Sequence, residues 1–114
     1  MTEIDRDKVR NDFAEAVNMT ASELKKWLDT EESRAVGWKG KDRKGKGESV
    51  GHASGRRIVA ILGKTKAELS DDDYAHMRKV VGYVRRHRAQ EPANIATSRW
   101  RYSLMNWGND PLKR

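Results

Sequence analysis

Apolar positions along the chain recur with the three- to four-residue spacing of one face of an α-helix. They predict helices over about residues 5–18, 20–30, 71–89 and 98–107. The apolar side of the longest of these consists of Tyr74, Met77, Val80, Val81 and Val84. A half-buried strand would alternate apolar and polar residues, and no segment of the sequence shows that alternation.

A less regular pattern lies at about residues 54–62, where Ile58, Val59, Ile61 and Leu62 form an almost continuous apolar run. Such a run fits a helix that ends at Gly63, and it also fits a short buried strand. We assign a third helix from Ser54 to Leu62, and the strand is the alternative that periodicity leaves open.

Three of these helices begin with capping residues. Asp5 precedes the first, whereas Thr20 with Glu23 and Ser70 with Asp73 have the spacing of a capping box. In a capping box the hydroxyl accepts a free N–H of the first turn while the carboxylate accepts the N–H of the cap itself. These starts are therefore defined locally, independently of the tertiary fold.

The composition is compatible with one ordered domain over residues 1–114. Charged residues make up 36% of the chain, against roughly 25% in an average domain, but four Trp and three Tyr supply material for a core. We expect an all-α, compact single domain of four or five helices. A long basic loop rich in Gly and Lys, about residues 37–48, should connect the second and third helices.

The net charge of +7 is unevenly distributed. Residues 1–33 carry 5 basic and 9 acidic side chains, whereas residues 34–66 carry 10 basic and 2 acidic ones. Within the predicted loop the cations are Lys39, Lys41, Arg43, Lys44 and Lys46. Cations on such a segment can each neutralise a phosphate and release a counterion, so this loop is our first candidate for nucleic-acid binding.

The predicted helices add rigid cations to this candidate site. Arg56 and Arg57 lie in the third helix. In the fourth, Arg78 and Arg85 are seven residues apart and so share a face, with Lys79 and Arg86 beside them. A solvated basic loop and exposed basic helix faces are also common without any ligand, and that reading stays open.

Other chemistry finds little support. Gly40 to Lys46 has the Gly-x4-Gly-Lys spacing of a phosphate-binding loop, but Gly47 stands where the Ser or Thr belongs, and no strand precedes it. The chain has no Cys, and His76 and His87 are too far apart along one helix to share an ion. We therefore predict no enzymatic activity, no cofactor and no metal. Without a secretory signal or membrane-spanning run, we expect a cytoplasmic protein.

Three segments carry a family resemblance: residues 48–59 (ESVGHASGRRIV), 71–83 (DDDYAHMRKVVGY) and 99–108 (RWRYSLMNWG). They resemble a family of short bacterial proteins without an established function, whose members are often labelled DNA-binding. The resemblance implies a nucleic-acid partner and supplies no catalytic or binding residues.

These observations favour non-enzymatic, largely sequence-tolerant binding of nucleic acid, duplex DNA first of all, which would place the protein at the nucleoid. Phosphate contacts would dominate, because no set of Asn and Gln side chains is arranged for base recognition. The alternative is a protein-interaction or stress-associated module whose cationic surface docks an acidic protein partner.

Overall fold

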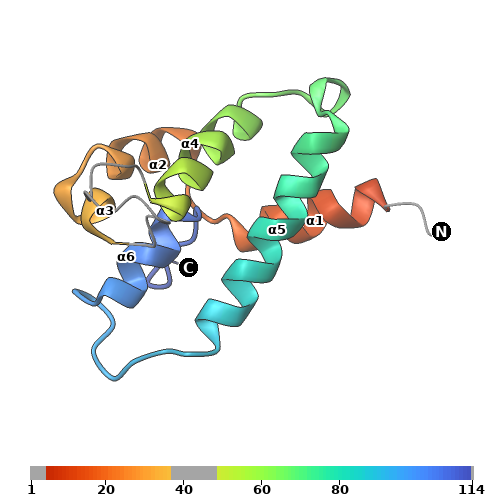
Figure 1. Ribbon diagram of the computed structural model, residues 1–114. Coiled ribbons are helices and arrows are strands. Elements are labelled where there is room, and N and C mark those ends of the chain that lie inside the picture. Colours follow the sequence, from red (N-terminus) through yellow and green to blue (C-terminus); the bar gives the residue numbers. More distant parts are fainter. Residues whose placement is uncertain (1–4, 37–48, 114) are drawn as a thin grey trace.

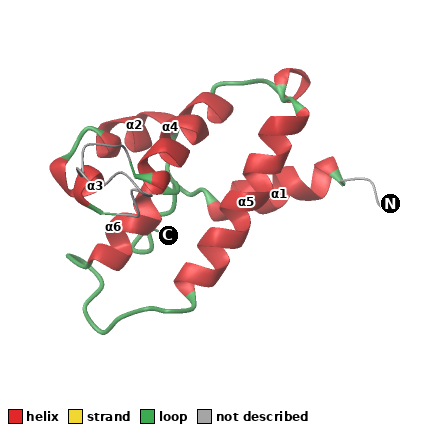
Figure 2. Cartoon of the chain, viewed as in Figure 1, coloured by secondary structure: helices red, strands yellow, loops and turns green. Residues whose placement is uncertain are grey.

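The computed structural model describes residues 5–36 and 49–113. Within these ranges the chain forms six α-helices and one short 3₁₀ helix, and no β-strand (Figure 1, Figure 2). In chain order the elements are α1 (Arg6–Ala16), α2 (Ala21–Leu28), α3 (Glu31–Ala35), α4 (Val50–Leu62), η1 (Lys66–Glu68), α5 (Asp71–Arg88) and α6 (Arg99–Asn106). The all-helical prediction is confirmed, and the predicted number of four or five helices is too low.

The helices form two groups that meet at α5. α1 crosses α5 and packs against it at one side of the molecule, while α2, α3, α4 and α6 gather at the other (Figure 1). Both α4 and α6 also contact α5, which links the groups. One aliphatic side chain from each of α2, α4, α5 and α6 is fully buried where they meet: Leu24, Ile58, Val80 and Leu104.

The predicted caps are confirmed. Asp5 accepts the N–H of Lys8 at 3.1 Å. The Ser70 hydroxyl accepts the N–H of Asp73 at 3.1 Å, and the Asp73 carboxylate accepts the N–H of Ser70 at 3.0 Å. Thr20 forms the same reciprocal pair with its partner in α2. Each cap satisfies backbone donors that the first turn of a helix leaves without an intrahelical acceptor.

α4 begins at Val50, four residues before the predicted start at Ser54, and the strand alternative for residues 58–62 is wrong. Ser49 caps the helix by accepting the N–H of His52 at 3.0 Å. Glycine disfavours a helix, so Gly51 and Gly55 obscured this start. A Cβ on Gly55 would lie only 2.6 Å from the backbone oxygen of Asn106, so the close approach of α4 to α6 requires glycine here.

The five-residue helix α3 was not predicted, although Thr30 caps it by accepting the N–H of Ser33 at 3.1 Å. Because α3 intervenes, residues 37–48 follow the third helix of the chain, and the predicted position between the second and third helices is wrong. The predicted loop itself lies outside the described residues.

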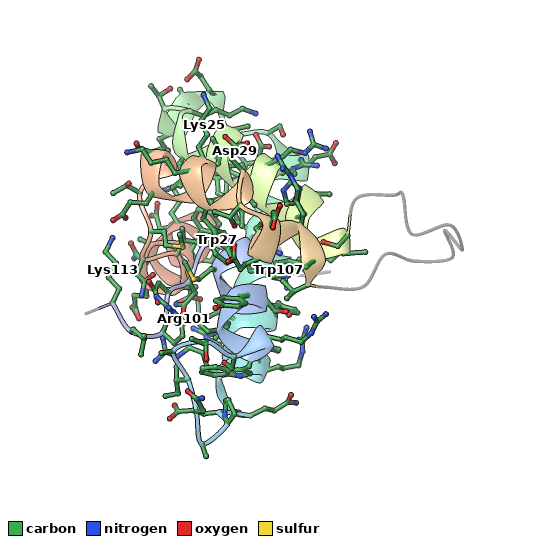
Figure 3. All side chains as sticks on the ribbon, turned by 90° about the vertical axis from the view of Figure 1, so that its left-hand side faces the viewer. Lys25, Trp27, Asp29, Arg101, Trp107 and Lys113 are labelled. Atoms are coloured by element: carbon green, nitrogen blue, oxygen red, sulfur yellow. The ribbon has the colours of Figure 1, made fainter. Side chains whose placement is uncertain are left out.

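Buried amides at the end of α6 and just after it tie this helix to other parts of the fold. The Asn106 side chain accepts the indole N–H of Trp27 at 2.8 Å and donates to the backbone oxygen of Ser33 at 3.0 Å. The Asn109 side chain donates to the backbone oxygen of Ala16 at 2.7 Å. Figure 3 shows Trp27 and Trp107 toward the middle of the molecule and Lys113 at its edge.

Candidate nucleic-acid interface

The exposed face of α5 carries two rows of cations. Residues seven apart lie on the same side of a helix, about two turns from each other. Arg78 and Arg85 form one row, Lys79 and Arg86 form the other, and all four side chains are exposed. From residue 74 to residue 90 the sequence has five cations and no carboxylate. The helix itself therefore contributes only positive side chains to this face.

Small residues separate the two rows. At about 100° per residue, Ala75 and Gly82 fall between them on the helix surface. A Cβ on Gly82 would meet no neighbour except the guanidinium of Arg86, with Nη1 at 3.1 Å. The surface between the two rows therefore carries no bulky side chain, and an extended anionic chain could lie close to the helix backbone there.

The row of Arg78 and Arg85 runs along the α1 side of α5. The Arg85 guanidinium lies 3.4 Å from the carboxylate of Asp12 in α1, and Lys8 contacts the same carboxylate at 2.7 Å. The hydrogen bond from Lys8, together with the charges of Lys8 and Arg85, lowers the pKa of Asp12. Asp12 thus remains ionised and offsets part of the charge of Arg85.

The two predicted cations of α4, Arg56 and Arg57, point in different directions. Arg56 and Arg57 are successive residues, so they point about 100° apart around the helix. Arg57 faces α5, where its guanidinium lies 3.3 Å from the buried carboxylate of Asp73. Lys64 binds the same carboxylate at 2.7 Å. Arg56 is exposed and does not line the cavities described below.

The five cations of the predicted loop, Lys39, Lys41, Arg43, Lys44 and Lys46, lie outside the described residues. The described residues that flank this segment are both buried, Val36 with 2% exposed surface and Ser49 with 1%. Ser49 also begins α4, and it lines one of the cavities beside Lys79. The chain therefore re-enters the described fold next to the second row of cations on α5.

The row of Lys79 and Arg86 borders a cavity of about 270 Å³ between the start of α4, α5 and α6. Its lining residues come from all three helices: Val50, Gly51, Lys79, Tyr83, Arg86, Ser103, Asn106 and Trp107. A second, more open cavity of about 450 Å³ shares Val50, Lys79 and Trp107 with the first and adds Arg57. The structure thus brings Arg57, Lys79 and Arg86 together around adjoining cavities.

A stack of aromatic rings forms the wall between α5 and α6. His76, Trp107, Tyr83, His87 and Trp100 follow one another with neighbouring ring centroids 4.2–6.2 Å apart and planes within 15° of parallel. Trp107 is 4% exposed and belongs to the hydrophobic core. Its place in the cavity wall was not predicted, because it depends on how α6 meets the start of α4.

His76 also contacts α4, where its Nε2 lies 2.9 Å from the hydroxyl of Ser54. Burial lowers the pKa of His76, and the nearby charges of Arg57 and Lys79 lower it further, so the ring is neutral at pH 7. A serine nucleophile also needs a group that orients its histidine. Among the described residues no carboxylate hydrogen-bonds to this ring. The contact joins α4 to α5.

Residues 5–36 and 49–113 contain no cluster of three or more His, Asp or Glu side chains close enough to hold a metal ion. Nor does any helix in these ranges have the length and apolar character needed to cross a lipid bilayer.

Comparison with known proteins identifies a family. Neither the curated proteins nor the solved structures include a match to this chain. The model of a family described as "Protein of unknown function (DUF3140)" matches residues 12–105, which run from α1 nearly to the end of α6. The resemblance to a family without an established function is thereby confirmed. Since the match spans most of the sequence, the chain belongs to the DUF3140 family of proteins of unknown function.

Proposed function

We propose that this protein binds nucleic acid, duplex DNA first of all, through the exposed face of α5. The observation that carries the proposal is the double row of Arg78, Lys79, Arg85 and Arg86 on a helix face without a carboxylate. A groove or a phosphate backbone can accept a helix of this kind, because each cation can neutralise a phosphate and release a condensed counterion.

The two rows differ in how available their charges are. Asp12 offsets part of the charge of Arg85, whereas neither Lys79 nor Arg86 has a carboxylate within 4 Å among the described residues. Lys79 and Arg86 therefore supply the larger share of the field in this proposal. Arg56 and Arg57 extend the surface from α4, and Lys39, Lys41, Arg43, Lys44 and Lys46 extend it from the sequence before Ser49.

Binding of this kind would be largely tolerant of sequence. Direct recognition of bases in the major groove uses Asn or Gln for adenine and Arg or Lys for guanine. The 18 residues of α5 include no Asn or Gln for adenine, and in this proposal its Arg and Lys side chains contact phosphates and not guanine. Affinity should then depend on salt far more than on base composition.

A titration of duplex DNA at several salt concentrations tests the proposal. If about four to six phosphates are neutralised, the logarithm of the affinity should fall against the logarithm of the salt concentration with a slope of about −4 to −5. Two duplexes of different sequence should give similar affinities. An absence of binding at low salt, or a slope near zero, would contradict the proposal.

A second experiment separates DNA from an acidic protein partner. The protein is purified from its source cells with and without nuclease treatment of the lysate. Nucleic acid that co-purifies only without nuclease, with no protein retained after nuclease, supports the proposal. A protein partner that survives the nuclease treatment would contradict it and favour docking to an acidic protein surface.

A further inference from the structure

We propose that the cavity between the start of α4, α5 and α6 binds the phosphate group of a small phosphate monoester. This inference goes beyond the proposed nucleic-acid binding and does not depend on it. It rests on three kinds of donor that converge on one cavity: the first backbone amides of α4, the indole N–H of Trp107, and the cations Lys79 and Arg86.

The first donors are the amides at the start of α4. Ser49 accepts the N–H of His52, but no described residue accepts the N–H of Val50 or of Gly51. Both of these residues line the cavity. Free amides and the helix dipole make the start of a 13-residue helix attractive to an anion.

The second donor, Trp107, points to a ligand independently of the helix. Trp107 is 4% exposed, yet its indole N–H has no acceptor among the described residues. Every fully buried side-chain nitrogen or oxygen of the described chain has a hydrogen-bond partner. Because this indole nitrogen has none, it is not fully buried. The N–H therefore opens onto the cavity that Trp107 lines.

Gly51 keeps this donor accessible. A Cβ at Gly51 would lie 3.0 Å from Nε1 of Trp107 and would cover the indole N–H. Glycine is less favourable than alanine within a helix, so its presence here is consistent with a need for space. Gly51 and Trp107 thus border the same cavity.

The cations complete an anion site. Lys79 and Arg86 project from positions about two turns apart on the cavity side of α5, and among the described residues no carboxylate lies within 4 Å of either. Several N–H donors together with two positive charges match the oxygens and double negative charge of a phosphate monoester better than a single carboxylate. The phenol ring of Tyr83 and the side chain of Val50 provide apolar contact for an organic group.

The size of the cavity limits the ligand. Pockets for organic ligands usually enclose about 300–1,000 Å³, and this one encloses about 270 Å³. The phosphate would therefore occupy the inner part beside Trp107 while the ester group lies toward the opening. A free mononucleotide and the 5′-phosphate end of a nucleic-acid strand share this chemistry.

The indole N–H of Trp107 provides a direct readout by two-dimensional NMR. Four probes are titrated in turn: inorganic phosphate, adenosine monophosphate, adenosine, and a 5′-phosphorylated dinucleotide. We expect a saturable shift of one Trp indole signal with every phosphorylated probe and none with adenosine. A stronger response to the dinucleotide than to the mononucleotide would assign the site to strand ends. Shifts that never saturate, or an equal response to adenosine, would overturn the inference.

Three variants localise the effect. Gly51→Ala leaves the charge unchanged but covers the indole N–H, and Lys79→Gln removes a cation, so each should weaken monoester binding about tenfold or more. Arg85→Gln removes a cation from the same helix but does not line the cavity, and it should leave monoester binding unchanged. Equal weakening by Lys79→Gln and Arg85→Gln would show a diffuse charge effect and overturn the inference. Gly51→Ala should spare DNA binding, so failures of the two proposals are distinguishable.

Discussion

The carboxylate of Asp73, with 5% of its side chain exposed, accepts hydrogen bonds from Lys64 at 2.7 Å, from Arg57 at 3.3 Å and from the backbone of Ser70 at 3.0 Å. The hydrogen bond from Lys64 comes first among the interactions that hold the pKa of Asp73 well below its usual value. One residue thus caps α5 and anchors it to Arg57, which lies in the middle of α4 and lines the second cavity.

This arrangement predicts a pH dependence of stability. A carboxylate whose pKa is depressed by folding contributes stability above the pKa of the unfolded chain, about 3.9, and that contribution is lost as the pH falls further toward the folded-state pKa. Asp73→Asn should lower the free energy of unfolding at pH 7 by at least about 1 kcal/mol. The variant should also lose less stability than the wild type when the pH falls below 4. Urea unfolding at pH 7 and pH 3 measures both effects.

Asp72→Asn provides the matched control, since Asp72 is an exposed neighbour in the same turn. It should change the stability at pH 7 less than Asp73→Asn does and should keep the acid sensitivity of the wild type. If Asp73→Asn loses as much stability on acidification as the wild type, the carboxylate does not have the role described.

Two glycines give opposite predictions for the same substitution. Alanine is favoured over glycine within a helix by about 1 kcal/mol. In Gly55→Ala the Cβ would lie 2.6 Å from the oxygen of Asn106 and 2.7 Å from a methyl of Leu28, so we expect a net loss of about 1–3 kcal/mol. In Gly82→Ala the new methyl meets only the flexible end of Arg86, so we expect a gain of up to about 1 kcal/mol. Thermal unfolding compares the two, and stabilisation by both would show that α4 and α6 are not in such close contact.

At the scale of elements, capping signals that span a few residues predicted helix starts correctly. The predicted start of α4 was wrong because this start depends on tertiary contacts. The capping boxes at Thr20 and Ser70 placed the starts of α2 and α5 correctly, because a cap acts within one turn. The start of α4 was missed because Gly51 and Gly55 disfavour a helix and are required by contacts with α6. α3 was missed because five residues are too few for a periodic pattern to appear.

The same distinction applies to the candidate site. Spacing along one helix predicted that Arg78 and Arg85 share a face, with Lys79 and Arg86 beside them, and it needed no knowledge of the fold. No spacing could show that the start of α4 faces Trp107, because these residues lie more than 50 positions apart in the sequence. The sequence therefore predicted the charged surface and missed the cavity beside it.

The basic segment before Ser49 gives a prediction of its own. We expect that replacement of Lys39, Lys41, Arg43, Lys44 and Lys46 by Gln reduces the slope of DNA affinity against salt by about 0.9 for every one of them that contacts a phosphate. Urea unfolding of the same variant serves as the control that it remains folded. An unchanged slope would remove the segment from the interface and leave α5 to account for binding alone.

At the scale of the whole molecule, α5 has two different sides because two groups of helices meet on it. α1 covers one edge and supplies Asp12, which offsets the charge of Arg85. The start of α4 and α6 cover the other edge and leave Lys79 and Arg86 beside the cavity. The fold therefore makes one row of cations more available than the other.

The most direct test of the account compares two double variants with the same loss of charge. Lys79→Gln with Arg86→Gln removes the available row of α5. Lys25→Gln with Lys26→Gln removes two exposed cations from α2, in the other helix group. Figure 3 shows Lys25 on this helix. Duplex DNA is titrated against both variants and the wild type over the same range of salt. We predict that the α5 variant weakens binding at least about tenfold and reduces the salt slope by about 2, while the α2 variant stays close to the wild type. Equal weakening in the two variants would contradict the account, because binding would then follow net charge and not the exposed face of α5.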